Sequence, residues 1–188
     1  MINIEKLLSD TEYSHSKNVA KISKIIALKA GYSEDEASII EQAALLHDIG
    51  KTAIPPDILN KPNALTTKEY EIVKTHTETG YKQIMETVKI LTISASVAKE
   101  HHERLNGEGY HKLSGSDISP YSKLISVADV FDALMSRRSY KEPWDTSKVI
   151  NYLSEHYEQF DCGMVKYLIT VISDVLILYN PNHITNCT

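Results

Sequence analysis

The sequence is poor in glycine, proline and cysteine. Seven glycines and six prolines in 188 residues favour a helical protein over a strand-rich sandwich, because these two residues punctuate turns and interrupt regular elements. The only cysteines, Cys162 and Cys187, are too few for a disulfide framework, which makes a reducing cytoplasm the simplest expected location.

The sequence also lacks long apolar runs and an excess of positive charge. No apolar signal core stands at the N-terminus, and the most apolar segment, 168–178, is too short to cross a bilayer and is interrupted by Ser173 and Asp174. The net charge of −5 argues against a general nucleic-acid surface. No repeat or linker divides the chain, so a single domain is expected.

Apolar residues at helical spacing predict a mainly helical chain. Ser33 with Glu36, and Thr66 with Glu69, have capping-box spacing and predict two helix starts. Gly50 is interpreted as a helix stop, Gly80 as an interruption, and the Pro55-Pro56 pair as a non-helical connection. The predicted helices cover 13–30, 33–49, 66–76, 90–103, 123–135, 144–160 and 161–179, with a loop over 104–119.

The segment 46–51 places an imidazole, a carboxylate and an ammonium at the end of a predicted helix. His47 and Asp48 offer the nitrogen and oxygen ligands that suit a transition metal of intermediate hardness. Neighbouring helical residues diverge by roughly 100°, so the pair can share one ion only where the helix ends, or else serve two adjacent ions. A helix terminus with a hydrogen-bonded histidine and a solvated aspartate is the alternative.

More candidate ligands lie near the ends of successive predicted helices: His15, His76, the His101-His102 pair and Asp129. Helix-bundle proteins build metal sites from side chains on facing helices. Asp129 and Asp132, three residues apart, share one side of a helix and need a cationic partner or exposure to water. Each residue alone also fits a surface position, and the expectation of a site rests on their combination.

Two further features fit a phosphate ligand. The loop around Gly107 and Gly109 could bring backbone N–H groups close to a ligand, or could be a plain turn. The cationic cluster Arg137, Arg138 and Lys141 is either a phosphate clamp or a solvated charge run.

With these residues in place, the chain resembles the HD-GYP family, a branch of the HD-domain metal-dependent phosphohydrolases. The matching segments are ALLHDIGK at 44–51, IPPDILNKP at 54–62, KTHTETG at 74–80, HHERLNGEGY at 101–110 and ISVADVFDALMSRRSYK at 125–141. They occur in order over nearly the whole chain from His15 onward.

The resemblance implies an all-α fold: a single HD-type helical bundle over 1–188 with a metal site in its core. Residues 1–10 would be a short extension, about 11–145 the metal-binding core and about 146–180 the C-terminal helices. The implied metal ligands are His15, His47, Asp48, His76, His101, His102 and Asp129. Asp48 would bridge two divalent ions, with iron or manganese expected first and nickel, cobalt, zinc or magnesium as alternatives.

The resemblance also implies a substrate, cyclic di-GMP, opened to linear pGpG and in some members cut on to GMP. Asp48 and Lys51 would be the catalytic residues, with Lys51 near the scissile phosphate. The implied substrate contacts are Gly107, Gly109, Tyr110, Arg138 and Lys141. A cyclic dinucleotide is thus the expected small-molecule partner. A homodimer and a protein partner, such as a diguanylate cyclase or a separate sensor, are compatible with the chain.

Three positions depart from the family pattern. His111 replaces the signature proline, Asn106 replaces an aspartate before the first loop glycine, and Thr11 replaces a glutamate that helps some members hold a third metal, with Glu12 one place away. Thr11 favours two metals over three, the two loop changes bear on how the substrate is bound, and three hypotheses remain. The chain is a cyclic di-GMP phosphodiesterase, an HD-domain hydrolase of another nucleotide or cyclic dinucleotide, or a binding module that retained its metals.

Overall fold

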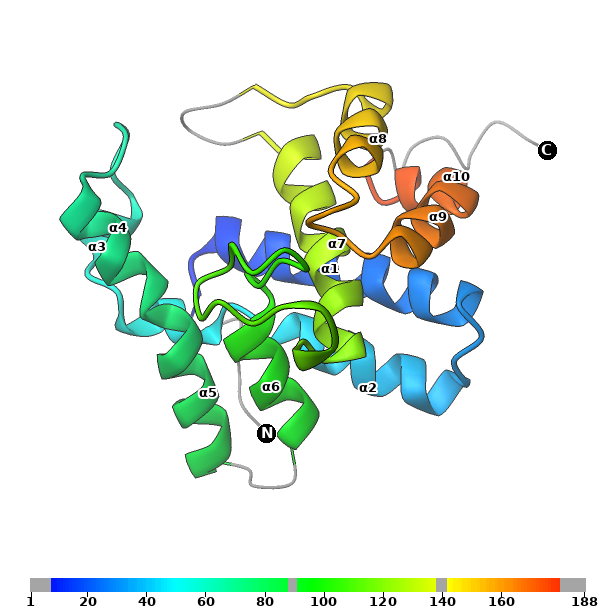
Figure 1. Cartoon of the computed structure of the whole chain (residues 1–188). Helices are drawn as coiled ribbons and strands as arrows, with labels where there is room; N and C mark the ends of the chain where they lie inside the picture. The colour runs from blue at the N-terminus through cyan, green and yellow to red at the C-terminus, as the bar shows by residue number, and fades with distance from the viewer. Residues whose placement is uncertain (1–7, 88–90, 138–141, 180–188) are drawn as a thin grey trace.

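The computed structural model describes residues 8–87, 91–137 and 142–179, and these are helical with no strand among them (Figure 1). The all-α prediction is therefore confirmed for the described residues. The α-helices are α1 (Asp10–Lys29), α2 (Glu34–Leu45), α3 (Pro56–Leu59), α4 (Thr67–Lys74), α5 (His76–Thr87), α6 (Thr92–Glu100), α7 (Pro120–Met135), α8 (Thr146–Glu155), α9 (Cys162–Thr170) and α10 (Ile172–Leu176). Two short 3₁₀ helices, η2 (Ile49–Ala53) and η3 (Gly115–Asp117), complete the set.

Helices α1 and α7 run through the middle of the molecule, with α3, α4 and α5 on one side and α8, α9 and α10 on the other (Figure 1). Ile22 and Ile26 of α1 and Leu124 and Phe131 of α7 are completely buried in the main core. Each such side chain contributes about 1.5–3 kcal/mol on burial. The core therefore holds α1 and α7 together, although about 100 residues separate them in the sequence.

The two predicted capping boxes are confirmed, and they set where α2 and α4 begin. The Ser33 hydroxyl accepts from the backbone N–H of Glu36, whose carboxylate accepts from the Ser33 N–H at 2.8 Å. Thr66 and Glu69 make the same reciprocal pair, at 2.7 Å for the Thr66 N–H. Each box satisfies N–H groups that a helix start leaves without partners.

The prediction that Gly50 stops a helix and that Gly80 interrupts one is wrong. Helix α2 already ends at Leu45, Gly50 lies within η2, and Gly80 lies inside α5. A Cβ atom on Gly50 would lie 1.9 Å from the His76 carbonyl oxygen and 2.5 Å from the Gly80 backbone nitrogen. The two glycines therefore let the backbone of η2 pack directly against the backbone of α5. Glycine is required at position 50 by this tertiary contact and not by the end of a helix.

Other helix boundaries also differ from the predictions. Pro56 begins α3 instead of preventing a helix, because proline at the first helical position loses no hydrogen bond. Ser9 caps α1, which starts at Asp10 instead of Tyr13. The predicted closing helix over 161–179 divides into α9 and α10. The break expected near His76 is present, since α4 ends at Lys74 and α5 begins at His76.

A search of the described helices for a segment long and apolar enough to cross a membrane finds none.

Candidate metal centre

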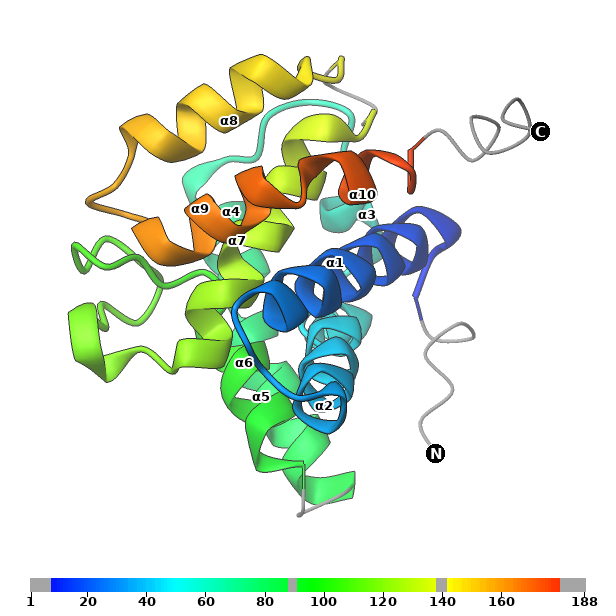
Figure 2. The same ribbon diagram turned by 90° about the vertical axis from the view of Figure 1, so that its right-hand side faces the viewer.

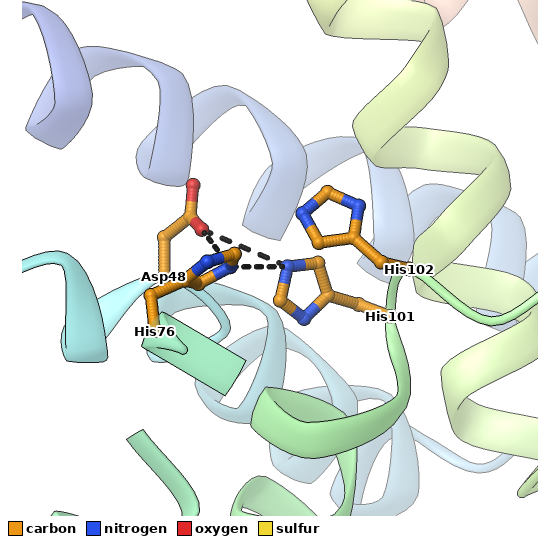
Figure 3. Close-up of side chains that lie close together, drawn as sticks. All are labelled: Asp48, His76, His101 and His102. Atoms are coloured by element: carbon orange, nitrogen blue, oxygen red, sulfur yellow. Dashed lines mark hydrogen bonds and ion pairs between the residues drawn. The ribbon is translucent and has the colours of Figure 1, made fainter. Parts of the chain in front are cut away.

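The structure brings the seven predicted ligand residues together from five parts of the chain. In the first set, which we call the His76 group, the ligand atoms of Asp48, His76, His101 and His102 lie within 4.8 Å of one another (Figure 3). In the second, the His15 group, the same holds for His15, His47 and Asp48. Asp129 adjoins the His15 group, with its Oδ1 3.0 Å from the Nε2 of His15. Asp48 belongs to both groups and lies between them.

His47 and Asp48 can face one site because α2 ends before it reaches them. Leu46 is the C-cap, and the backbone of Asp48 has φ −101° and ψ 9°, outside the regular helix. The Nε2 of His47 lies 3.2 Å from the Oδ2 of Asp48. The condition set by the sequence, that the helix must be ending for neighbouring residues to converge, is met here.

Three of the imidazoles are held by backbone carbonyls close to them in the sequence. The Nδ1 atoms of His47, His76 and His101 donate to carbonyl oxygens at distances of 2.6, 2.7 and 3.1 Å. The acceptors are Ala44 for His47, Val73 for His76, and both Val97 and Ala98 for His101. In the neutral form of each ring the proton is then on Nδ1, and the lone pair of Nε2 is directed into the cluster.

At the centre of the cluster, several hydrogen-bond acceptors face one another without hydrogen-bond donors. The Nε2 atoms of His76 and His101 lie 3.3 Å apart, and neither carries a proton to share when its Nδ1 donates to a carbonyl. The Nε2 of His47 and the Oδ1 of Asp48 are buried without a hydrogen-bond partner. Buried acceptors that face one another are unfavourable unless a cation lies among them. Nitrogen and carboxylate oxygen donors in this arrangement fit a divalent metal ion.

Electrostatics favour the protonation states that metal ligands need. Burial, together with the neighbouring His47 and His76, lowers the pKa of His101 to about 4 despite the opposing Asp48. Burial likewise holds the pKa of His102 well below its usual value. Burial raises the pKa of Asp48, but Lys51 and His47 outweigh it and hold that pKa well below its ordinary range. Two imidazoles of the His76 group, those of His101 and His102, are therefore neutral beside an ionised carboxylate.

His15 is held differently, by two carboxylates of α7. Its Nδ1 donates to the Oδ2 of Asp132 at 2.6 Å, while its Nε2 faces Asp129. Burial lowers the pKa of His15, but the two carboxylates raise it overall to about 9. Burial raises the pKa of Asp129, and the contact with His15 brings it well below its usual range. Sequence reasoning placed Asp132 beside Asp129 but did not include it in the site.

Lys51 directs its ammonium group at the residue that the two groups share. Its Nζ lies 2.7 Å from the Oδ2 of Asp48 and 3.7 Å from the Oε1 of Glu12. Burial lowers the pKa of Lys51, but Asp48 raises it above its ordinary value, so the side chain is charged. Glu12, one place from the position expected for a third-metal ligand, is thus paired with Lys51.

The predicted substrate-contact loop lies against the His76 group. The ring of Tyr110 is 4.5 Å from the ring of His102, centroid to centroid, and meets Tyr70 edge-on at 6.0 Å. A Cβ on Gly109 would lie 2.4 Å from the Cα of Glu103, so glycine is needed for this close packing. Gly107 has a φ of +79°, a left-handed conformation that favours glycine. The close packing at Gly109 and the left-handed backbone at Gly107 thus shape the loop that holds Tyr110 beside the imidazoles.

The two departures from the family pattern in this loop make hydrogen bonds of their own. The backbone N–H of His111 donates to Glu103 at 2.8 Å, a bond that proline could not make, and Leu113 donates to the other oxygen of Glu103 at 2.8 Å. The Nε2 of His111 lies 3.0 Å from the hydroxyl oxygen of Thr77 in α5. The Oδ1 of Asn106 accepts from the Glu108 N–H at 3.1 Å. Glu103, which is buried, was not predicted as a loop anchor.

The expected phosphate contacts Arg138 and Lys141 lie outside the described residues. Arg137, the described neighbour, is an exposed residue that pairs with Glu142 at 3.0 Å.

The model of the HD domain family matches residues 2–163. The chain is 40% identical over 139 residues to the cyclic di-GMP phosphodiesterase response regulator RpfG of Xanthomonas campestris, covering 73% of this chain and 37% of that protein. It is 43% identical over 133 residues to a cyclic di-GMP phosphodiesterase of Thermotoga maritima, covering 70% and 36%.

A third relative, the 3′3′-cGAMP-specific phosphodiesterase 2 of Vibrio cholerae, is 34% identical over 165 residues, covering 78% of this chain and 32% of that protein. The chain therefore spans about a third of the length of these curated relatives.

Two solved structures share the fold. The HDG"Y"P protein Bd1817 of Bdellovibrio bacteriovorus superposes with a TM-score of 0.69 at 20% identity, over 85% of this chain and 51% of that one. The HD domain of the phosphodiesterase PgpH of L. monocytogenes, in complex with cyclic-di-AMP, gives a TM-score of 0.63 at 22% identity, over 98% and 97%. At these identities the likeness concerns the fold alone.

Proposed function

The chain belongs to the HD domain family, and from that premise we propose that it is a metal-dependent phosphodiesterase that hydrolyses cyclic di-GMP to linear pGpG. The observation that carries this proposal is the buried cluster of imidazole Nε2 atoms around Asp48, with the charged Lys51 at its edge. The relatives named as cyclic di-GMP phosphodiesterases support the choice of substrate. Cleavage onward to GMP is the further reaction that product analysis would detect.

A divalent metal suits the cluster, and we propose that it would hold two such ions, with Asp48 as the residue shared between them. His76, His101 and His102 would hold one ion, and His15, His47 and Asp129 the other. Iron or manganese is the first choice, because the donor set is rich in histidine with carboxylates. Such ions supply Lewis acidity toward a phosphoryl oxygen and activate water near neutral pH.

The chain's own residues supply the rest of the chemistry. Lys51 is charged and lies 2.7 Å from Asp48, where it would neutralise charge on the phosphoryl group or protonate the departing oxygen. Tyr110, held beside His102 by Gly107 and Gly109, would contact the substrate and limit the access of water. Arg138 and Lys141 would bind the second phosphate, a role that rests on the family resemblance alone.

A second candidate function is hydrolysis of a different cyclic dinucleotide. The loop beside the site carries His111 in place of proline, tied to Glu103 and Thr77, and one of the relatives is named as specific for 3′3′-cGAMP. A changed loop next to the imidazoles would alter which bases fit. The single-domain organisation, a cytoplasmic location, a homodimer and a separate sensor or diguanylate cyclase partner stay predictions.

The test is turnover by anaerobically purified protein whose metal content has been measured by elemental analysis. The protein is reconstituted with Fe²⁺ or Mn²⁺ and incubated with cyclic di-GMP, 3′3′-cGAMP and cyclic di-AMP, and the products are separated by chromatography. Formation of pGpG or GMP supports the first proposal. Turnover of another cyclic dinucleotide alone supports the second. Binding without turnover of any of the three would contradict both and identify a receptor module.

A further inference from the structure

Tyr179, the last described residue of the chain, contacts Asp132 beside the candidate metal centre. Tyr179 follows α10, and its hydroxyl donates to the Oδ1 of Asp132 at 2.5 Å. Its ring packs edge-on against Phe131 of α7, with centroids 6.3 Å apart. Figure 2 shows α10 beside α1, so this closing segment lies next to the helix that carries His15. The match to the HD domain model ends at residue 163, so Tyr179 lies beyond the matched residues.

Asp132 is a completely buried carboxylate that accepts hydrogen bonds from three donors. Its Oδ2 accepts from His15, and its Oδ1 accepts from the Nδ2 of Asn18 at 3.0 Å and from Tyr179. A buried charge of this kind is strongly unfavourable without such bonds. Two of the donors come from α1 and the third from the C-terminal segment, so the orientation of Asp132 depends on both.

The orientation of His15 depends in turn on Asp132. With its Nδ1 proton donated to Asp132, His15 directs its Nε2 towards Asp129 and the other ligand atoms. A carboxylate that accepts from the second nitrogen of a ligand histidine fixes both its tautomer and its ring orientation, and raises its basicity. His47, His76 and His101 use carbonyls within a few residues of themselves for this purpose. His15 alone among the described ligand histidines uses a carboxylate that another segment also holds.

We propose that Tyr179 is a positioning residue of the metal centre: its hydroxyl fixes Asp132, and Asp132 orients His15 as a metal ligand. The C-terminal segment beyond the matched residues thereby tunes metal affinity on the His15 side of the centre. This inference rests on the proposed role of His15 as a ligand, and it is independent of which nucleotide the protein cleaves.

The first test is made on metal-free protein by NMR. Tyr179→Phe keeps the ring packed on Phe131 and removes only the donor. The imidazole ¹⁵N and Nδ1 proton resonances of His15 are expected to shift, because Asp132 loses one of its three hydrogen bonds. Tyr167→Phe, the same change in a tyrosine that packs against the core from α9, is expected to leave those resonances in place. His15 resonances that stay unchanged in Tyr179→Phe would overturn the proposal.

The second test is Mn²⁺ binding by competition with a chelator of known affinity. Loss of a carboxylate beside a ligand histidine weakens binding about 10–100-fold, which is the effect expected of Asp132→Asn, whereas Tyr179→Phe, one bond further away, should weaken it by about threefold. In Asp132→Asn and Tyr179→Phe, one Mn²⁺-binding step should weaken and the other should keep its affinity. In Tyr167→Phe, both binding steps should keep their affinities. A Tyr179→Phe protein that melts at a lower temperature but binds Mn²⁺ with unchanged affinity would show that the residue serves stability alone.

The two tests separate this inference from the proposed function. A protein that shows these effects but cleaves no cyclic dinucleotide keeps the role of Tyr179 and loses the phosphodiesterase activity. The opposite result is cleavage of cyclic di-GMP while Tyr179→Phe and Tyr167→Phe give the same His15 resonances and the same Mn²⁺ affinities. That result keeps the phosphodiesterase activity and removes the proposed role of Tyr179.

Discussion

The two sides of the candidate metal centre are built in different ways. In the His76 group, His76 and His101 are oriented by carbonyls three or four residues away, so the helix end that carries each ring also aims it. In the His15 group, His15 is oriented by Asp129 and Asp132, which lie 114 and 117 residues away. One side is thus organised by local backbone geometry, whereas the other combines a locally held His47 with a His15 that depends on the long-range packing of α1 against α7.

This difference has an electrostatic consequence. Around His76 the imidazoles face one another, and burial keeps the pKa of His101 and His102 low. Around His15 two carboxylates outnumber the imidazole and raise its pKa to about 9. A local anchor holds a neutral ligand ready for a metal, whereas the distant anchors hold His15 as a cation that must lose a proton when a metal binds.

Replacing the residue that both sides share should have the largest effect. Asp48→Ala is expected to abolish metal binding on both sides and to lower phosphodiesterase activity by about a thousandfold or more, because metal ions supply several kcal/mol of transition-state stabilisation. Elemental analysis and product assays check this. Asp35→Ala, an exposed change at the start of α2, is the matched control. Full activity in metal-free Asp48→Ala protein would refute the proposed chemistry.

Removing the ammonium group of Lys51, which pairs with Asp48, should lower the catalytic rate without changing metal binding. Lys51→Ala is expected to keep both ions and to lower kcat by about a hundredfold or more, since a positioned charge acts mainly on the transition state. Lys61→Ala, which breaks an ion pair with Glu69 outside the site, should leave kcat unchanged. An equal kcat in the two variants would remove Lys51 from catalysis.

The contrast in pKa predicts opposite pH dependences for the two sides in metal-free protein. The pKa of His15 is raised from 6.5 to about 9, so its stabilising contribution is complete below about pH 6.5 and is lost as the pH rises towards 9. The pKa of His101 is lowered from 6.5 to about 4, so the folded state binds fewer protons and stability falls as the pH drops from 6.5 towards 4. Each contribution is at most about 3 kcal/mol.

Chemical denaturation between pH 4 and 9, with a chelator present, measures both slopes. His15→Gln should flatten the alkaline slope only, and His101→Gln the acidic slope only. Identical profiles for the two variants would show that the sides do not differ in charge.

The smallest effect is expected where the loop joins the His76 group. His111→Ala removes the contact with Thr77 and should lower the free energy of unfolding by about 1 kcal/mol. His111→Pro also removes the N–H bond to the Glu103 carboxylate and should lower it by about 2–3 kcal/mol, since bonds to charged groups are stronger. Thermal denaturation compares the two. Equal losses would show that the N–H bond contributes nothing.

Local signals in the sequence predicted local structure well. The capping boxes at Ser33 and Thr66 and the break near His76 depend on residues within one turn of each other. The same local interpretation went wrong at Gly50 and Pro56. At Gly50 the reason for the residue is a contact between η2 and α5, and at Pro56 the first position of a helix tolerates proline.

The amino-acid sequence by itself determined which side chains could form a metal centre, because ligand chemistry is a property of residue type and the chain carries seven such residues in the order expected from the resemblance. Only the tertiary structure decided how the ligands are held. Asp132, Glu103 and Tyr179 form their bonds with groups that α1, α7, the 104–119 loop and the closing helices bring together. Such partners are chosen by the packing of the core, and spacing along the chain does not encode them.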